Sequence, residues 1–240
     1  MNKYYIDAHC HLNAGGDMDA VVAAAQRAGV AKCVWNAVTE MDWAPIMNAS
    51  ANTPGVCGAI GIHPWHVGAV RDGWDIRMAD ALVARPDLMV GEIGLDKNYP
   101  DIDAQESVFI RQMEIAADLR RVVHIHWVGA WDRLLRVLIR LGDNIPPRMI
   151  MHGFGGSVEI MSMLAQRYPV YFSFGPAVLD NAHRRVQGCV RAAPGQCILA
   201  ESDGANPIVV MAVVDKISQL RGADMTGVVY INSMGALVNG

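Results

Sequence analysis

The sequence lacks a long hydrophobic run, an excess of basic residues and paired cysteines. Its longest uninterrupted apolar run, residues 208–214, is too short to span a bilayer, and the first residues form no signal-peptide core. We therefore expect neither membrane association nor secretion. With 20 Lys and Arg against 24 Asp and Glu, nucleic-acid binding through a basic surface is disfavoured. The five cysteines form no C-x-x-C pair and favour reduced thiols in the cytoplasm.

The chain is rich in apolar residues, which make up 52% of its 240 residues, so disorder is excluded and a large core is expected. Short runs rich in Val, Ile or Tyr alternate with amphipathic stretches. The clearest helical pattern is at residues 131–141, where leucines recur every three or four residues opposite arginines. We predict strands at residues 4–12, 31–38, 56–63, 88–95, 122–127, 149–152, 170–174 and 197–201.

This alternation gives about eight strand–helix units of roughly 30 residues, the size of a βα repeat. Repeated βα units imply a parallel sheet, and eight of them predict an α/β fold closed into a (β/α)₈ TIM barrel. A doubly wound open sheet is the alternative. No linker or low-complexity tract divides the chain, so we expect a single domain over residues 1–240.

Potential metal ligands occur where the predicted strands end, which is where the active site of a βα barrel lies. The first strand contains His9 and His11, and because side chains alternate along a strand, these two rings share a face. In the fourth strand, Glu92 lies within an apolar run beside glycines that permit close approach. A buried carboxylate is costly unless it is paired or binds a metal.

Three further candidates follow on later strands. His126 lies nearer the mouth of the predicted barrel than His124, which we place about 6–7 Å deeper, behind the ligands or in the core. His152 precedes a glycine-rich turn, and Asp203 follows the eighth strand. Nitrogen and oxygen ligands without thiolate suit Zn, Mn, Ni or Mg. Because six ligands exceed one tetrahedral site, we predict two divalent ions that share Glu92.

These motifs resemble the TatD family of metal-dependent deoxyribonucleases, within the amidohydrolase-like barrels. The resemblance covers nearly the whole chain. It is carried by residues 6–12 (IDAHCHL), 61–64 (GIHP), 91–96 (GEIGLD), 152–156 (HGFGG) and 201–203 (ESD), and by the strand of His126. It implies hydrolysis of DNA, commonly from the 3′ end. It also implies a pair of ions, one held by His9, His11 and Asp203 and the other by His126 and His152, with Glu92 between them.

The resemblance also assigns chemical roles. Asp203 is expected to orient and deprotonate the attacking water, and Glu92 to bridge the ions. Val128 stands where family members usually carry an arginine two residues after the histidine of the fifth strand. The chain therefore lacks one expected phosphate contact.

Substrate contacts are expected around the mouth. His63 is a candidate for contacting a phosphate, although it equally suits a role in fixing the turn at Pro64. Trp65, His66 and Trp127 are candidates for stacking on the bases of single-stranded DNA. Tryptophan near a helix start more often packs in the core.

Two alternatives stay open. An amidohydrolase-type C–N hydrolase shares this barrel class, but many such enzymes carry a carbamylated lysine where this chain has Glu92. A TatD-like subunit of a bacterial antiviral defence complex would have protein partners and altered or reduced catalysis. Val128 favours that alternative modestly, whereas retention of all six candidate ligands argues against it.

Overall fold

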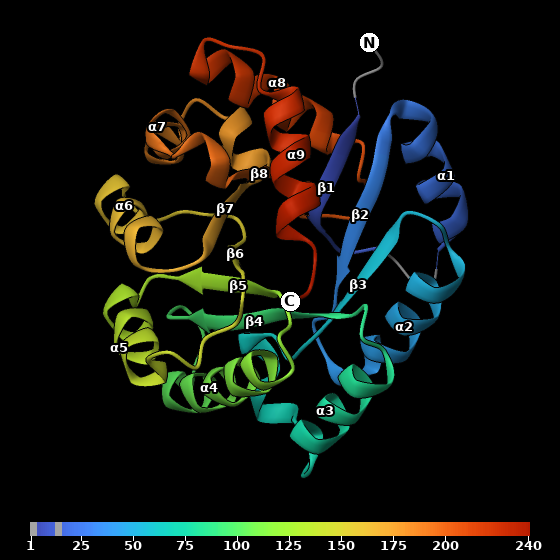
Figure 1. The fold of residues 1–240 in the computed structure, drawn as a ribbon, viewed down its shortest axis with the longest axis vertical. Coiled ribbons are helices and arrows are strands. Elements are labelled where there is room, and N and C mark those ends of the chain that lie inside the picture. Colours follow the sequence, from blue (N-terminus) through green and yellow to red (C-terminus); the bar gives the residue numbers. More distant parts are fainter. Residues whose placement is uncertain (1–3, 13–15) are drawn as a thin grey trace.

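The computed structural model describes residues 4–12 and 16–240. Eight parallel strands form one sheet in the order β1 to β8, and the sheet curls into a barrel (Figure 1). The strands are β1 (Tyr5–Cys10), β2 (Val30–Asn36), β3 (Val56–Ile60), β4 (Met89–Asp96), β5 (Val123–Val128), β6 (Met149–Met151), β7 (Val170–Phe174) and β8 (Ile198–Ala200). All eight predicted strands are confirmed.

Helices follow the strands and surround the barrel (Figure 1). The predicted helix at 131–141 is α5. The α-helices are α1 (Met18–Ala28), α2 (Trp43–Asn52), α3 (Trp74–Ala84), α4 (Ile102–Asp118), α5 (Trp131–Leu141), α6 (Val158–Arg167), α7 (Arg184–Ala192), α8 (Val209–Arg221) and α9 (Thr226–Ala236). Short 3₁₀ helices are η1 (Glu40–Asp42), η2 (Pro64–Ala69), η3 (Pro176–Leu179) and η4 (Gly195–Cys197).

The first and last strands lie beside each other, which excludes the open-sheet alternative. Around this seam the backbone N–H of Asp203 donates to the carbonyl oxygen of His9 (3.0 Å). The buried carboxyl group of Asp7 accepts hydrogen bonds from the backbone N–H (2.8 Å) and the hydroxyl (2.5 Å) of Ser202. A side chain of β1 thus closes the barrel and places the residues that follow β8 against those that end β1.

Two layers of apolar residues make up the core. The larger layer packs between the strands and the surrounding helices. The smaller cluster joins Val34, Met89 and Ile150 to Leu199 and to Ala236 of α9, a set that only the inside of a barrel can bring together. Because α9 covers the end of the barrel where the strands begin, the barrel is open at the end where its strands finish.

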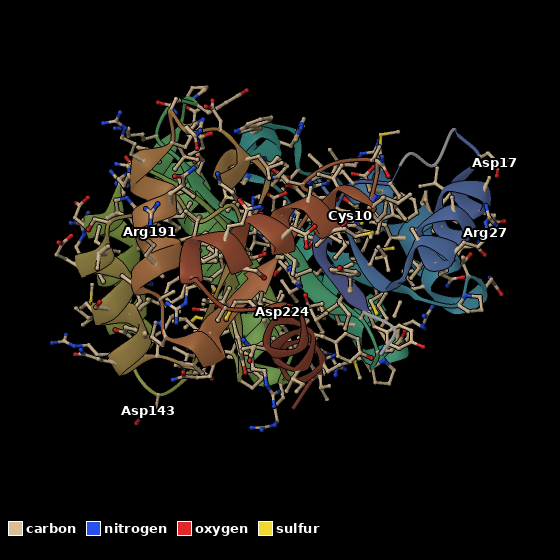
Figure 2. The ribbon with its side chains drawn as sticks, turned by 90° about the horizontal axis from the view of Figure 1, so that it is seen from above. Cys10, Asp17, Arg27, Asp143, Arg191 and Asp224 are labelled. Atoms are coloured by element: carbon tan, nitrogen blue, oxygen red, sulfur yellow. The ribbon has the colours of Figure 1, made fainter. Side chains whose placement is uncertain are left out.

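Charged side chains lie on the outer surface. Asp17, Arg27, Asp143 and Arg191 are exposed at the periphery, whereas Cys10 is buried (Figure 2). All five cysteines are free thiols. Among residues 4–12 and 16–240, no helix combines the length and the apolar character needed to cross a membrane.

Candidate metal centre

Glu92 lies at the centre of the site because two glycines let the neighbouring chain approach. At Gly91, a Cβ atom would lie 2.5 Å from Asn36 Oδ1, and at Gly94 it would lie 1.8 Å from the carbonyl oxygen of His126. Gly94 also has a φ of +152°, which side chains rarely permit. The glycines beside Glu92 therefore permit the close approach expected from the sequence, at Gly91 to β2 and at Gly94 to β5.

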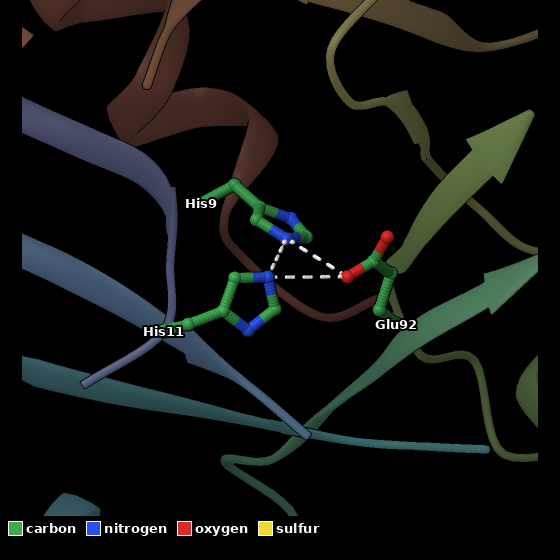
Figure 3. Close-up of side chains that lie close together, drawn as sticks. All are labelled: His9, His11 and Glu92. Atoms are coloured by element: carbon green, nitrogen blue, oxygen red, sulfur yellow. Dashed lines mark hydrogen bonds and ion pairs between the residues drawn. The ribbon is translucent and has the colours of Figure 1, made fainter. Parts of the chain in front are cut away.

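One oxygen of the Glu92 carboxylate faces His9 of β1 and His11, which follows β1. Glu92 Oε2 lies 3.3 Å from His9 Nε2 and 3.3 Å from His11 Nε2, and the two nitrogens lie 3.2 Å apart (Figure 3). His11 Nδ1 faces the carbonyl oxygen of Asn36 (3.2 Å), so we assign the proton to Nδ1 and leave Nε2 bare. The lone pairs of His11 Nε2 and Glu92 Oε2 thus face one point beside His9 Nε2.

The other oxygen of Glu92 faces the histidines that follow. Glu92 Oε1 lies 2.8 Å from His126 Nδ1 and 2.9 Å from His152 Nε2, and these two nitrogens are 3.2 Å apart. His152 Nδ1 faces Glu201 Oε1 (3.2 Å), and His126 Nε2 faces Asp96 Oδ2 (3.5 Å). In neutral His152 the proton therefore lies on Nδ1, and the Nε2 that faces Glu92 is bare. His126 Nε2 makes no hydrogen bond with the described residues, so its contacts do not assign its proton.

Both groups of atoms have the spacing of metal ligands. Ligand atoms around a tetrahedral zinc ion with bonds of about 2.0–2.1 Å lie roughly 3.3 Å apart. The distances on each side of Glu92, from 2.8 to 3.3 Å, are close to that value. Imidazole and carboxylate atoms at this spacing on both sides of Glu92 form a donor set that fits divalent metal.

His63 also reaches Glu92 but differs from the other histidines. Its Nε2 lies 3.2 Å from Glu92 Oε1, close enough for a metal group with Glu92 and His126. However, His63 Nδ1 accepts a hydrogen bond from the backbone N–H of Trp65 (3.2 Å) at the start of η2. In neutral His63 the proton therefore lies on Nε2. We interpret His63 as a hydrogen-bond donor that faces the site rather than as a metal ligand.

Electrostatics keep the central carboxylate ionised. Burial alone would raise the pKa of Glu92, but the surrounding histidines, His152 and His9 foremost, outweigh burial and hold this pKa well below its ordinary value. Burial lowers the pKa of His9 well below its usual range. At His11 and His152, burial is outweighed by the adjacent Glu92, which raises the pKa, so these two rings must release any bound proton when they bind a metal. An ionised carboxylate and a neutral imidazole are the forms that bind metals.

Asp203 lies at the rim, beside the His9 and His11 group. Its Oδ1 is 3.7 Å from His11 Nε2, and 43% of its side chain is exposed. Its backbone has a φ of +49°, which is uncommon for a non-glycine residue, and the hydrogen bond to the carbonyl oxygen of His9 holds it there. Burial raises the pKa of this carboxyl group. The carboxylate is thus both close to His11 and reachable from solvent.

His124 lies deeper than the six predicted ligands, as expected. It is fully buried, and its ring centroid lies 5.7 Å from that of His9. Neither ring nitrogen has a hydrogen-bond partner among the described residues. Burial lowers the pKa of His124 to about 3, so the ring is neutral.

The two tryptophans predicted to contact substrate occupy different places. Trp65 is 46% exposed, stacks on Tyr99 at 4.5 Å and donates to Asp96 Oδ2 (2.9 Å), so it stands at the mouth. Trp127 is buried and packs against Phe109 of α4 at 5.3 Å. The prediction that Trp127 contacts substrate is therefore corrected. Side chains alternate along β5, so the ring of Trp127 points away from the face that carries His126.

Three side chains in or around the site were not assigned a role from the sequence. Glu201 accepts from the backbone N–H of Gly153 (2.6 Å) and orients His152, Asp96 faces His126, and Tyr99 supports the exposed tryptophan. Position along the strand could have indicated the two carboxylates, because each is an even number of residues from a predicted ligand. Nothing local in the sequence marks Tyr99.

Comparison with known proteins gives the family. The model of the family described as TatD-related DNase matches residues 6–234. The chain belongs to this family. Human deoxyribonuclease TATDN3 is 25% identical over 97% of this chain and 93% of its own length. The 3′-5′ ssDNA/RNA exonuclease TatD of Yersinia pseudotuberculosis is 28% identical over 62% of this chain and 58% of its own.

The fold has a close counterpart among solved structures. The crystal structure of YjjV, a TatD homolog from Escherichia coli, superposes with a TM-score of 0.87 and covers 97% of both chains at 23% identity. The predicted family and TIM-barrel fold are therefore confirmed. None of these TatD-family relatives supports the defence-complex alternative.

Proposed function

We propose that this chain acts as one domain, spanning residues 1–240, that removes nucleotides from the 3′ end of single-stranded DNA. The observation that carries the proposal is the arrangement around Glu92, whose two oxygens each face a pair of imidazole nitrogens. We assign His9, His11 and Asp203 to one divalent ion and His126 and His152 to the other, with Glu92 between them. The similar 3′-5′ ssDNA/RNA exonuclease TatD of Yersinia pseudotuberculosis supports the choice of single-stranded DNA as the substrate.

Divalent ions at these positions would supply positive charge to the phosphodiester and increase the acidity of a water molecule. The rest of the chemistry belongs to side chains. Asp203 is placed to accept the proton of the attacking water, whose oxygen forms a bond to phosphorus while the bond to the leaving 3′ oxygen breaks. The leaving oxygen takes up a proton from solvent, and Asp203 returns its proton to solvent. The Nε2–H of His63 is placed to donate to a phosphate oxygen. Trp65, supported by Tyr99, offers an exposed ring for a base.

Other details of the proposal rest on chemistry. The carboxylate at position 92 favours phosphodiester over C–N hydrolysis, since it occupies the place of a carbamylated lysine. The donor set suits Zn, Mn, Ni or Mg. We place the enzyme in the cytoplasm, because five free thiols suit a reducing compartment.

The test is hydrolysis of a 5′-labelled single-stranded oligonucleotide by purified, chelator-treated protein supplied with each ion in turn. We expect a ladder of products shortened from the 3′ end. Glu92→Gln and Asp203→Asn should abolish it, whereas Asp215→Asn, an exposed carboxylate on α8, should not. Cleavage of an RNA strand or at internal positions would redirect the substrate assignment. Absence of hydrolysis with every ion would contradict the proposal.

A further inference from the structure

A second cavity lies beside the metal centre on the same face of the barrel. The metal-centre cavity, about 260 Å³, includes His63 and Trp65 in its lining. The second cavity, about 360 Å³, lies between the segments that follow β2 and β3. We call it the side cavity; it is lined by residues 39–41, Ile62, His66 and residues 69–71. Ile62 and His66 flank the residues that reach the metal centre, so one segment forms a wall of both.

A third hollow shares lining residues with both cavities. It is lined by His11 and Val38, which also line the metal-centre cavity, and by Thr39, which also lines the side cavity. The rings of His63 and His66 lie 6.5 Å apart, one on each side of the shared wall. A single strand bound at the metal centre can therefore extend toward the side cavity.

The lining of the side cavity suits a flat apolar group next to an anion. Met41, Ile62 and Val70 provide apolar surface, and Met41 is 85% exposed. Arg71 is exposed and its side chain makes no ion pair or hydrogen bond with the described residues. The acidic side chain of the lining, Glu40, is paired with Arg77 through two contacts of 2.5 and 3.0 Å. The unpaired charge at this cavity is therefore positive.

The walls are held in place before any ligand binds. Arg77 donates to Glu40 on one wall and to the carbonyl oxygens of Asp72 (2.9 Å) and Arg71 (3.4 Å) on the other. The indole N–H of Trp43 also joins the two segments by donating to the carbonyl oxygen of Gly61 (2.9 Å). Because the walls are already ordered, binding a ligand in this cavity costs little conformational entropy of the protein.

We propose that the side cavity is a nucleobase subsite. It holds the base of a nucleotide next to the scissile phosphate, and Arg71 contacts the phosphate of the same strand. The occupant is a single strand rather than a duplex, because a paired base cannot enter a cavity. The proposal rests on the proposed function, and it assigns to Arg71 a cationic contact near the mouth that Val128 cannot make.

The experiment compares two substrates and two variants. Methyl p-nitrophenyl phosphate is a phosphodiester whose only ring belongs to the leaving group, and a short single-stranded DNA oligonucleotide carries bases on both sides of the scissile phosphate. Ala69→Trp fills the side cavity from an exposed position, and Arg71→Glu reverses its charge. Arg140→Glu, the same charge change on the exposed face of α5, is the matched control. Thermal unfolding of each variant confirms that it is folded.

Both variants should raise KM for the oligonucleotide about tenfold, the loss expected for one stacked base or phosphate contact, with kcat retained. Hydrolysis of methyl p-nitrophenyl phosphate should be unchanged, and Arg140→Glu should change the hydrolysis of neither substrate. In wild-type protein, an abasic residue at one position beside the scissile phosphate should weaken binding, and Ala69→Trp should remove that position's effect.

An unchanged oligonucleotide KM in both variants would overturn the subsite, as would an equal loss on both substrates. Fluorescence anisotropy of a labelled oligonucleotide with EDTA present measures binding without cleavage. If wild-type protein cleaves neither substrate but the variants still bind the strand more weakly, the proposed function fails and the subsite stands. If cleavage occurs and binding is unaffected, the reverse holds.

Discussion

Glu201→Gln tests whether the metal centre depends on the carboxylate behind His152. Glu201 is fully buried, and its Oε1 faces His152 Nδ1 at 3.2 Å and accepts the Gly153 N–H at 2.6 Å. Glutamine keeps an oxygen for the glycine but removes the charge that fixes the ring. Loss of such a partner weakens metal binding about 10–100-fold, or about 1.4–2.8 kcal/mol.

The assay is competition for Zn²⁺ or Mn²⁺ with a chromophoric chelator. The matched control is Glu159→Gln, the same substitution at an exposed position in the first turn of α6. The control should leave metal affinity in place. If Glu201→Gln binds the ions as tightly as wild type while folded, the orienting role of Glu201 is refuted.

Three further variants test the frame around the site by urea unfolding. Gly94→Ala should cost about 3 kcal/mol or more, because its Cβ would lie 1.8 Å from a backbone oxygen of β5; Gly188→Ala, with open space around it, should be neutral or stabilising. Trp127→Leu should cost about 1–3 kcal/mol without changing KM for DNA, and a raised KM would restore the rejected role. Ser202→Ala should cost about 1–3 kcal/mol by leaving Asp7 without its hydroxyl partner, and unchanged stability would show that the seam is held otherwise.

The sequence was sufficient to predict the barrel because its strands and helices follow simple local patterns. Eight short apolar runs alternate with amphipathic segments, and the ends of parallel strands must meet at one face. The same rule brought His9 and Glu92 together although they are far apart in the chain. The depth of His124 followed from the rise along a strand.

Features that depend on three-dimensional contacts could not be predicted in this way. The donor role of His63 follows from a backbone N–H in the next turn. The stacking of Trp65 on Tyr99 brings η2 against the segment that follows β4. The side cavity likewise forms between two segments that are separate in the sequence, those that follow β2 and β3. Trp127 is a different case, since strand alternation alone was enough to place it outside the barrel once His126 faced inward.

The central claim is that Glu92 lies between two divalent ions. Anomalous diffraction from crystals of the metal-loaded protein, collected at the absorption edge of the added ion, tests it most directly. The account predicts two peaks, one beside His9 and His11 and the other beside His126 and His152, with one oxygen of Glu92 toward each. A single peak, or two peaks that leave Glu92 unbound, would contradict it.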